Sequence, residues 1–315
     1  MQTILDLGAD VDSRFIMVAC AAQSFKPYKI ANERESILKW LRSVPRGSRV
    51  GMESTGAYHE LLADLAQAAG MQVFVINPRN LRRYAQAIGR RGKTDRIDAE
   101  AIARYVAREH TQLHGYVPPS KEQRRLARLI GRRAQAVKTQ QMLKQSLVGI
   151  SGVSRELKTA LAAVSRIIAK LDTLIKQTLE KLPEARNAAR QIAAIPGFGV
   201  LSSTYLGYSF TRLPYSSSDA VVAQSGLDPR PNESGKQHGR RRLSKHGPSE
   251  QRRLLFNCAM SASSTVHWRP YYQAQLAKGL SSTAALVVLA RKMLRVAFAV
   301  YRNGQSFDPS RLVNA

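Results

Sequence analysis

Four acidic residues have the types and spacing needed to bind divalent metal ions. Asp10 follows an apolar run, Glu53 ends another, and Asp95 and Asp98 are three residues apart at a predicted helix start, so both project from one face. Four carboxylates brought together repel one another unless cations neutralise them, and hard oxygen ligands suit Mg²⁺ or Mn²⁺. Two such ions about 4 Å apart can stabilise the attacking and leaving oxygens of a phosphoryl transfer.

Each of these acids also has a structural explanation when taken alone. Asp95 would complement the dipole of a helix from its first turn, and Glu53 could bind a loop amide at a strand end. Asp6 and Asp12 share the strand face of Asp10, so Asp12 is the alternative first ligand. The joint order of strand acid, strand acid and helical DxxD nevertheless favours a metal site.

Ser234 is the second candidate for chemistry, in the segment NESGKQHGRRRLSKHG at 232–247. A serine hydroxyl is a weak nucleophile at neutral pH, and no Ser-His-Asp order surrounds this one. The segment does supply positive charge that could neutralise a phosphate in a transition state, from Lys236, Arg240, Arg241, Arg242 and Lys245. Ser234 therefore either attacks a phosphate or only binds one.

The charge of the whole chain indicates a polyanionic partner. The 315 residues include 49 Lys and Arg against 22 Asp and Glu, a net charge of +27, which favours nucleic acid. An anionic membrane is the weaker alternative, because the basic residues are spread along the chain and cations interrupt the longest apolar stretch, at 284–301. With two widely separated cysteines and no signal-like start, we expect a protein of a reducing cytoplasm.

The first 110 residues alternate between strand and helix patterns, which predicts a mixed sheet with helices on its faces. The predicted strands are 4–10, 15–22, 27–32, 49–55 and 71–78. The predicted helices are 35–44, 57–70 and 94–108, with Thr94 as the N-cap of the last. If the strands that end at Asp10 and Glu53 are neighbours, the acids and the DxxD helix can converge.

From Pro119 onward the strand signal disappears and the pattern becomes helical. Residues 121–148 predict a basic amphipathic helix that could follow a nucleic-acid backbone, with Arg124, Arg128 and Arg132 among its cations. Residues 157–182 carry an apolar heptad stripe, which predicts a coiled coil between protomers. The alternative is an intramolecular hairpin, in which this stripe packs on 121–148.

The segment IAAIPGFGVLSSTYL at 192–206 resembles a helix-hairpin-helix, a motif in which turn amides near Gly197 and Gly199 face a phosphate. An ordinary glycine-capped turn is the alternative. We predict three regions: 1–150 with an α/β fold and the trailing basic helix, 151–183 as the coiled coil, and 184–315 as a helical domain that carries the serine.

The motifs together resemble the DEDD transposases of bacterial insertion sequences, specifically the insertion-sequence 110 family and the related Piv and MooV DNA invertases. The resemblance runs nearly end to end. It rests on Gly8-Ala9-Asp10, Glu53-Ser54-Thr55-Gly56, Lys93 to Ala99 (KTDRIDA), Ile195 to Gly199 (IPGFG), Ser225 to Pro229 (SGLDP), Glu233-Ser234-Gly235 and Leu243 to Gly247 (LSKHG).

This resemblance implies a RuvC-like, ribonuclease-H-type fold for the N-terminal domain, with Asp10, Glu53, Asp95 and Asp98 as metal-binding acids. It also implies a helical transposase domain in which Ser234 is a covalent nucleophile towards DNA. Relatives work as multimers, so a dimer or tetramer is expected, and some use a structured bridge RNA to pair with donor and target DNA. Many carry a lysine three residues after the first acid, where this chain has Ser13.

We therefore expect a DNA transposase that cuts and rejoins strands through a phosphoserine link, with Mg²⁺ or Mn²⁺ at the acids. One alternative is a junction-resolving nuclease whose acids activate water, with Ser234 only binding phosphate. Another is a non-catalytic protein that binds DNA or RNA, for which the charge alone would suffice.

Overall fold

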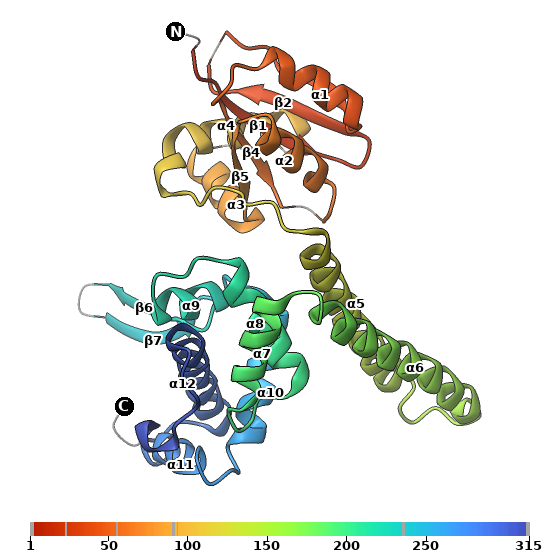
Figure 1. Cartoon of the computed structure of the whole chain (residues 1–315), viewed down its shortest axis with the longest axis vertical. Helices are drawn as coiled ribbons and strands as arrows, with labels where there is room; N and C mark the ends of the chain where they lie inside the picture. Colours follow the sequence, from red (N-terminus) through yellow and green to blue (C-terminus); the bar gives the residue numbers. More distant parts are fainter. Residues whose placement is uncertain are drawn as a thin grey trace. The chain divides into compact units, whose positions relative to one another are not determined.

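The computed structural model describes residues 3–22, 24–54, 56–89, 92, 94–234 and 237–312, without the side chains of 231–234, 237, 238, 240 and 311. The chain forms two compact units, Met1–Pro118 and Pro119–Ala315 (Figure 1). The division differs from the predicted boundary at 150, because the basic helix packs against the next helix of the chain and so belongs to the second unit.

The N-terminal unit contains the predicted mixed sheet. Its strand order is β3-β2-β1-β4-β5; β1 pairs in parallel with β4, β4 in parallel with β5, and the other neighbours are antiparallel. The strands are β1 (Asp6–Val11), β2 (Phe15–Cys20), β3 (Tyr28–Ala31), β4 (Arg49–Glu53) and β5 (Gln72–Ile76). The expectation that the strands bearing Asp10 and Glu53 are neighbours is confirmed.

Helices cover both faces of this sheet, as Figure 1 shows. They are α1 (Arg34–Ser43), α2 (His59–Ala68), α3 (Pro78–Ala87) and α4 (Asp95–Glu109), followed by a 3-10 turn, His110–Gln112. Leu7, Ala9 and Met52 pack with side chains of α1 and α2, whereas Ile102 and Val106 of α4 pack with β5 and α3. The helix α3 was not predicted, because Leu81 is its only buried residue in a polar, arginine-rich segment.

Glycines let α4 lie directly on the sheet. A Cβ atom at Gly8 of β1 would overlap the backbone of Ala99 and Ala103, and one at Gly51 of β4 would overlap the side chain of Val106. Gly8 and Gly51 stand two residues before Asp10 and Glu53, and side chains two apart on a strand share a face. Because the acids share a face with these glycines, they lie on the side of the sheet that α4 covers.

Replacing Gly8 with alanine is expected to destabilise the N-terminal unit by about 1–3 kcal/mol, because backbone atoms of α4 must move to admit the methyl group. Hydrogen exchange at the amides of β1 and β4 would measure the loss within this unit. Gly115→Ala is the matched control, since a Cβ there meets no atom within 4 Å. Equal protection in both variants would contradict the expected overlap.

The C-terminal unit begins with two long helices, α5 (Lys121–Ser146) and α6 (Ser154–Leu179), which pack on each other as a hairpin (Figure 1). Ser120 caps α5 through a reciprocal capping box with Gln123. The Arg133 guanidinium forms an ion pair with Asp172 at 2.5 Å. The intramolecular packing left open from the sequence therefore occurs, while a coiled coil between protomers stays a prediction.

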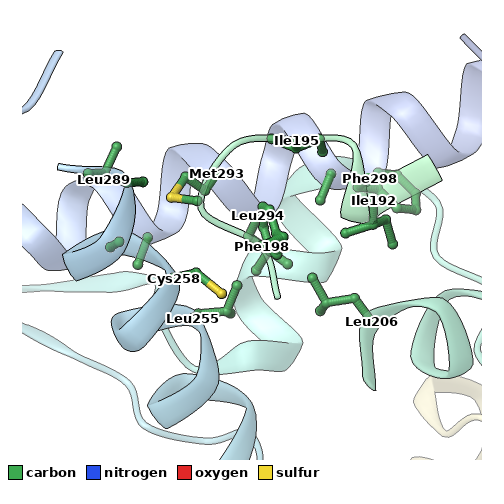
Figure 2. Packing of buried hydrophobic residues seen from close by; sticks show 14 of the residues in the cluster. Ile192, Ile195, Phe198, Leu206, Leu255, Cys258, Leu289, Met293, Leu294 and Phe298 are labelled. Carbon is green, nitrogen blue, oxygen red and sulfur yellow. The ribbon is translucent and has the colours of Figure 1, made fainter. Parts of the chain in front are cut away.

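Further helices form the body of this unit around one apolar core. They are α7 (Pro183–Ala193), α8 (Val200–Arg212), α9 (Ser218–Ser225), α10 (Ser249–Ala262), α11 (Arg269–Ala277) and α12 (Ser282–Asn303), with a 3-10 turn at Pro309–Leu312. Figure 2 shows buried side chains from α7, α8, α10 and α12 directed toward one another, including Ile192, Leu206, Leu255 and Leu294. Gly304 ends α12 in the left-handed conformation.

The expectation of an all-helical region after Pro119 is wrong at one place. Residues 229–243 form an antiparallel hairpin of β6 (Pro229–Ser234) and β7 (Gln237–Leu243), with an irregularity between Arg230 and Asn232. The segment is rich in charge and glycine and has no alternating apolar residues, so it gives no strand pattern. Among the described residues, no helix is long and apolar enough to cross a membrane.

Candidate functional site

Asp10 and Glu53 lie beside each other on the sheet. Ala9 of β1 is paired with Met52 of β4, so the next residue of each strand, Asp10 and Glu53, falls in the adjacent row. Both acids are half-buried, and both have the strand parity of the two glycines that contact α4. The two strand acids therefore share one face and one end of a parallel strand pair.

Asp98 reaches the same region from α4. Glu53 and Asp98 both line a cavity of about 400 Å³ under α3 and α4, whose other lining residues include Arg82, Gln86 and Ile102. Thr94 is the N-cap of α4, and its hydroxyl accepts a hydrogen bond from the Ile97 amide, as predicted. The cap fixes the start of the helix, and with it the positions of the DxxD acids.

Asp95 has a partner that the sequence did not indicate. Its Oδ2 atom is 2.9 Å from Nζ of Lys29, on β3, and both side chains are more than half exposed. Lys29 is paired with Met17, and Met17 with Asp10, so Lys29 and Asp10 belong to one row across the sheet. This ion pair can be recognised only from the strand register, because Lys29 and Asp95 are 66 residues apart in the sequence.

The donor atoms fit a hard divalent cation in kind, since all four acids offer carboxylate oxygens on the α4 side of the sheet. Among the described residues, no three such side chains lie close enough together to share one ion. Asp95 is instead neutralised by the Lys29 ammonium. A shared ion would therefore require these side chains to draw closer.

The turn after β1 distinguishes Asp10 from its alternative, Asp12. Oδ1 of Asp12 accepts hydrogen bonds from the Ser13 hydroxyl at 2.8 Å and the Arg14 amide at 3.1 Å. These hydrogen bonds, the Ser13 hydroxyl first, hold the pKa of Asp12 below its ordinary value. Asp12 is thus engaged in the β1–β2 turn.

We expect Asp12→Asn to keep metal affinity and activity within about threefold of wild type, because an amide oxygen can still accept the turn's hydrogen bonds. Asp10→Asn should lower the affinity for Mn²⁺ at least tenfold, since the amide carries no negative charge. Titration calorimetry with Mn²⁺ would measure both. The reverse pattern would make Asp12 the ligand.

Ser234 ends β6, where its backbone pairs with Gln237 of β7. Its side chain lies outside the described residues, as do the side chain of Arg240 and the whole of Lys236. Arg241, Arg242 and Lys245 are exposed. Most of the basic segment therefore lies in a hairpin, with Ser234 at the end of one strand.

Two motifs that flank the hairpin in the sequence form its base. Gly226 ends α9 with φ +71, and a Cβ there would lie 2.7 Å from the His246 amide nitrogen. Arg252 donates from one guanidinium nitrogen to the carbonyls of Ser225, at 3.2 Å, and Gly247, at 2.5 Å. The Ser244 hydroxyl also bonds to the Asp228 carboxylate. The SGLDP and LSKHG segments thus clamp the two strands together.

The other predicted nucleic-acid contacts lie elsewhere in the C-terminal unit. On α5, Arg124 is half-buried and Arg128 and Arg132 are exposed, at four-residue spacing along the helix. In the turn between α7 and α8, Gly197 has φ +97 and packs against α10 and α12. The Gly199 amide donates to the Ser202 hydroxyl at 3.0 Å. These two glycines therefore have structural roles in the turn.

Comparison with known proteins assigns the family. Residues 7–150 match the DEDD IS110 transposase model, and residues 189–273 match the model described as "Transposase IS116/IS110/IS902 family". The pilin gene-inverting protein of Moraxella lacunata is 30% identical over 270 residues, 82% of this chain and 81% of that protein. The transposase for insertion sequence element IS1328 of Yersinia enterocolitica is 27% identical, over 82% of this chain and 85% of its own.

The chain belongs to the IS110 transposase family. It is accordingly an enzyme of DNA recombination, a transposase or site-specific recombinase, and DNA is its partner. The DEDD type of the first match indicates dependence on a divalent metal.

The two IS110 matches cover both candidate sites. The first contains all four acids and continues through α5, and the second contains the β6–β7 hairpin with its clamp.

The sequence alone did not indicate Lys29, the clamp residue Arg252 or the role of Gly8 and Gly51 in docking α4. A small residue two positions before each strand acid is the one signal in the sequence that could have indicated that docking.

Proposed function

We propose that this IS110-family enzyme cuts and rejoins DNA through a covalent phosphoserine link at Ser234, with a divalent metal held by Asp10, Glu53, Asp95 and Asp98. The observation that carries the proposal is the common location of the acids: two adjacent on the sheet, one in a cavity with Glu53, and one in the first turn of the helix above. Such a group of hard donors suits phosphoryl transfer.

In the proposed reaction, the Ser234 oxygen attacks a DNA phosphorus. A serine–phosphate bond forms, the bond from phosphorus to the 3′ oxygen breaks, and that oxygen leaves as a 3′-hydroxyl after gaining a proton. The 3′-hydroxyl of a partner strand then attacks the phosphoserine and restores the serine hydroxyl. The number of phosphoester bonds is unchanged, so rejoining needs no ATP.

The chain's own residues supply binding and charge in this scheme. Arg241, Arg242 and Lys245 are exposed at or beside the hairpin and would hold the strand and neutralise the phosphate, together with Lys236 and Arg240. A bound Mg²⁺ or Mn²⁺ would polarise phosphate oxygens. The clamp at the base of the hairpin would keep the backbone at Ser234 in a fixed relation to α9 and α10.

The proposal includes a dimer or tetramer joined through the α5–α6 hairpin. Only part of the α6 stripe is buried within the chain, at Ile175 and Thr178, whereas Leu157, Leu161 and Val164 are half-buried. Large apolar side chains along this hairpin are exposed, namely Met142, Val148, Ile150 and Ile167. A second copy covering them would complete a coiled coil.

The proposal also includes a structured RNA, by likeness to bridge-RNA-using relatives, and a RuvC-like assignment of the N-terminal unit. Arg124, Arg128 and Arg132 of α5 offer cations at four-residue spacing to a nucleic-acid backbone. Sequencing the nucleic acid that copurifies with the chain tests the RNA: one abundant, structured species supports it, and a random mixture contradicts it.

The decisive experiment asks whether cleavage leaves protein on the DNA. The full chain would be incubated with Mg²⁺ and a plasmid carrying the genomic DNA on both sides of the coding sequence, then denatured and resolved by electrophoresis. We expect DNA-linked chain and phosphoserine after hydrolysis. Cleaved DNA free of protein would indicate the junction-resolving nuclease instead, and bound but uncleaved DNA would indicate a non-catalytic binding protein.

A further inference from the structure

The Lys29–Asp95 ion pair joins the edge of the sheet to the first turn of α4. Lys29 shares a cross-strand row with Asp10 through Met17, and this row continues to Glu53 on the other side of Asp10. The ammonium contacts Asp95, one of the four acids, at 2.9 Å. A positive charge supplied by the chain itself therefore lies against one of the four acids.

Charge balance gives this ammonium a role. Asp10, Glu53, Asp95 and Asp98 lie around one face, and these carboxylates would repel one another if they drew together without a cation. Among the residues with described positions, no three acids are close enough to share an ion. Asp95 is meanwhile neutralised by Lys29. In this conformation the Lys29 ammonium neutralises Asp95, which is part of the charge that a bound metal ion would neutralise.

The exposure of the pair makes it exchangeable. Side-chain exposure is 52% for Lys29 and 61% for Asp95, so water competes with the contact on both sides. Exposed ion pairs of this kind are weak, and a divalent cation offers a carboxylate a stronger partner than an ammonium does. Lysine can therefore yield Asp95 when a metal arrives, without unfolding any element.

We propose that Lys29 is a positioning residue of the acid site, an internal counter-ion that holds Asp95 until a divalent metal displaces it. The inference rests on the proposed metal-binding role of the acids. Its consequence has a definite sign: because Lys29 competes with the metal for Asp95, removing the lysine must tighten metal binding. A lysine that merely braced β3 against α4 would have the opposite effect, since its loss would loosen the site.

The test is the Mn²⁺ affinity of the full chain, measured by titration with electron paramagnetic resonance detection. We expect Lys29→Met to bind Mn²⁺ about three- to fivefold more tightly than wild type, the upper part of the range that an exposed ion pair allows. Lys29→Arg keeps the charge and should stay near wild type. Lys26→Met removes the same charge from an exposed position three residues earlier and serves as the matched control.

A double-mutant cycle with Asp95→Asn isolates the pair. In the Asp95→Asn background, Lys29→Met should no longer change the affinity, because the carboxylate that it competes for is gone. An unchanged or weaker affinity in Lys29→Met, or an equal gain in Lys26→Met or in the Asp95→Asn background, would overturn the counter-ion role.

The outcome for the metal site itself is read separately. If Asp98→Asn binds Mn²⁺ as tightly as wild type, the proposed acid site fails and the inference fails with it. If Asp98→Asn binds more weakly while Lys29→Met equals wild type, the acid site stands and only the role of Lys29 is lost.

Discussion

Ser234→Ala is expected to abolish the covalent protein–DNA adduct and to lower strand exchange by at least about 10³-fold. Alanine has no oxygen that can bond to phosphorus, whereas the neighbouring cations that hold the strand remain. DNA binding should therefore change little. Gel resolution of denatured reactions measures the adduct, and filter binding measures the affinity for DNA.

Ser244→Ala is the matched control for this prediction. Ser244 is the other serine of the basic segment, and its hydroxyl bonds to the Asp228 carboxylate in the clamp. Its loss should weaken the base of the hairpin without removing a nucleophile, so the adduct should still form. An adduct at wild-type level in Ser234→Ala would refute the nucleophile, and loss only in Ser244→Ala would transfer the role to that serine.

The second large effect is expected at the metal site. Asp98→Asn should lower strand exchange by about 10²–10⁴-fold, since a metal ligand supplies several kcal/mol of transition-state stabilisation. Chelation of divalent metal should have a comparable effect on the wild-type chain. DNA affinity should persist, because one carboxylate contributes little against a net charge of +27.

Glu100→Gln provides the control on the same helix. Glu100 is two residues beyond Asp98, and its carboxylate bonds to Arg96 at 3.1 Å, an interaction within one face of α4. Removing this charge should leave activity within about threefold of wild type. Strand exchange that survives both chelation and Asp98→Asn would mean that the acids are structural.

The sequence predicted the N-terminal unit well because its strands are short apolar runs, in which successive side chains point to opposite faces of the sheet. The run that ends at Glu53 and the run that ends at Asp10 each match a strand within a few residues. Parallel pairing of these two strands then follows from a single crossover. What could not be predicted is the register, and with it the row that links Lys29 to Asp10.

In the C-terminal unit the sequence predicted helices but not what they pack against. The stripe on α6 suits either a neighbouring chain or α5, since both would bury the same residues, and periodicity does not distinguish them. The β6–β7 hairpin gave no signal because its residues are polar on both faces. Its base is held by the clamp, including Arg252 on α10, which no local pattern relates to Ser225.

The clamp also constrains how the length of the hairpin can vary. Residues 225–229 and 243–247 are held to each other at one end, and beyond them β6 and β7 pair with each other. Inserting one residue in each strand would turn every later side chain to the opposite face, and inserting two would restore it. Insertions and deletions that relatives tolerate should therefore come in even numbers of residues per strand. The hairpin would then set the distance between the helices of this unit and the serine in steps of two residues.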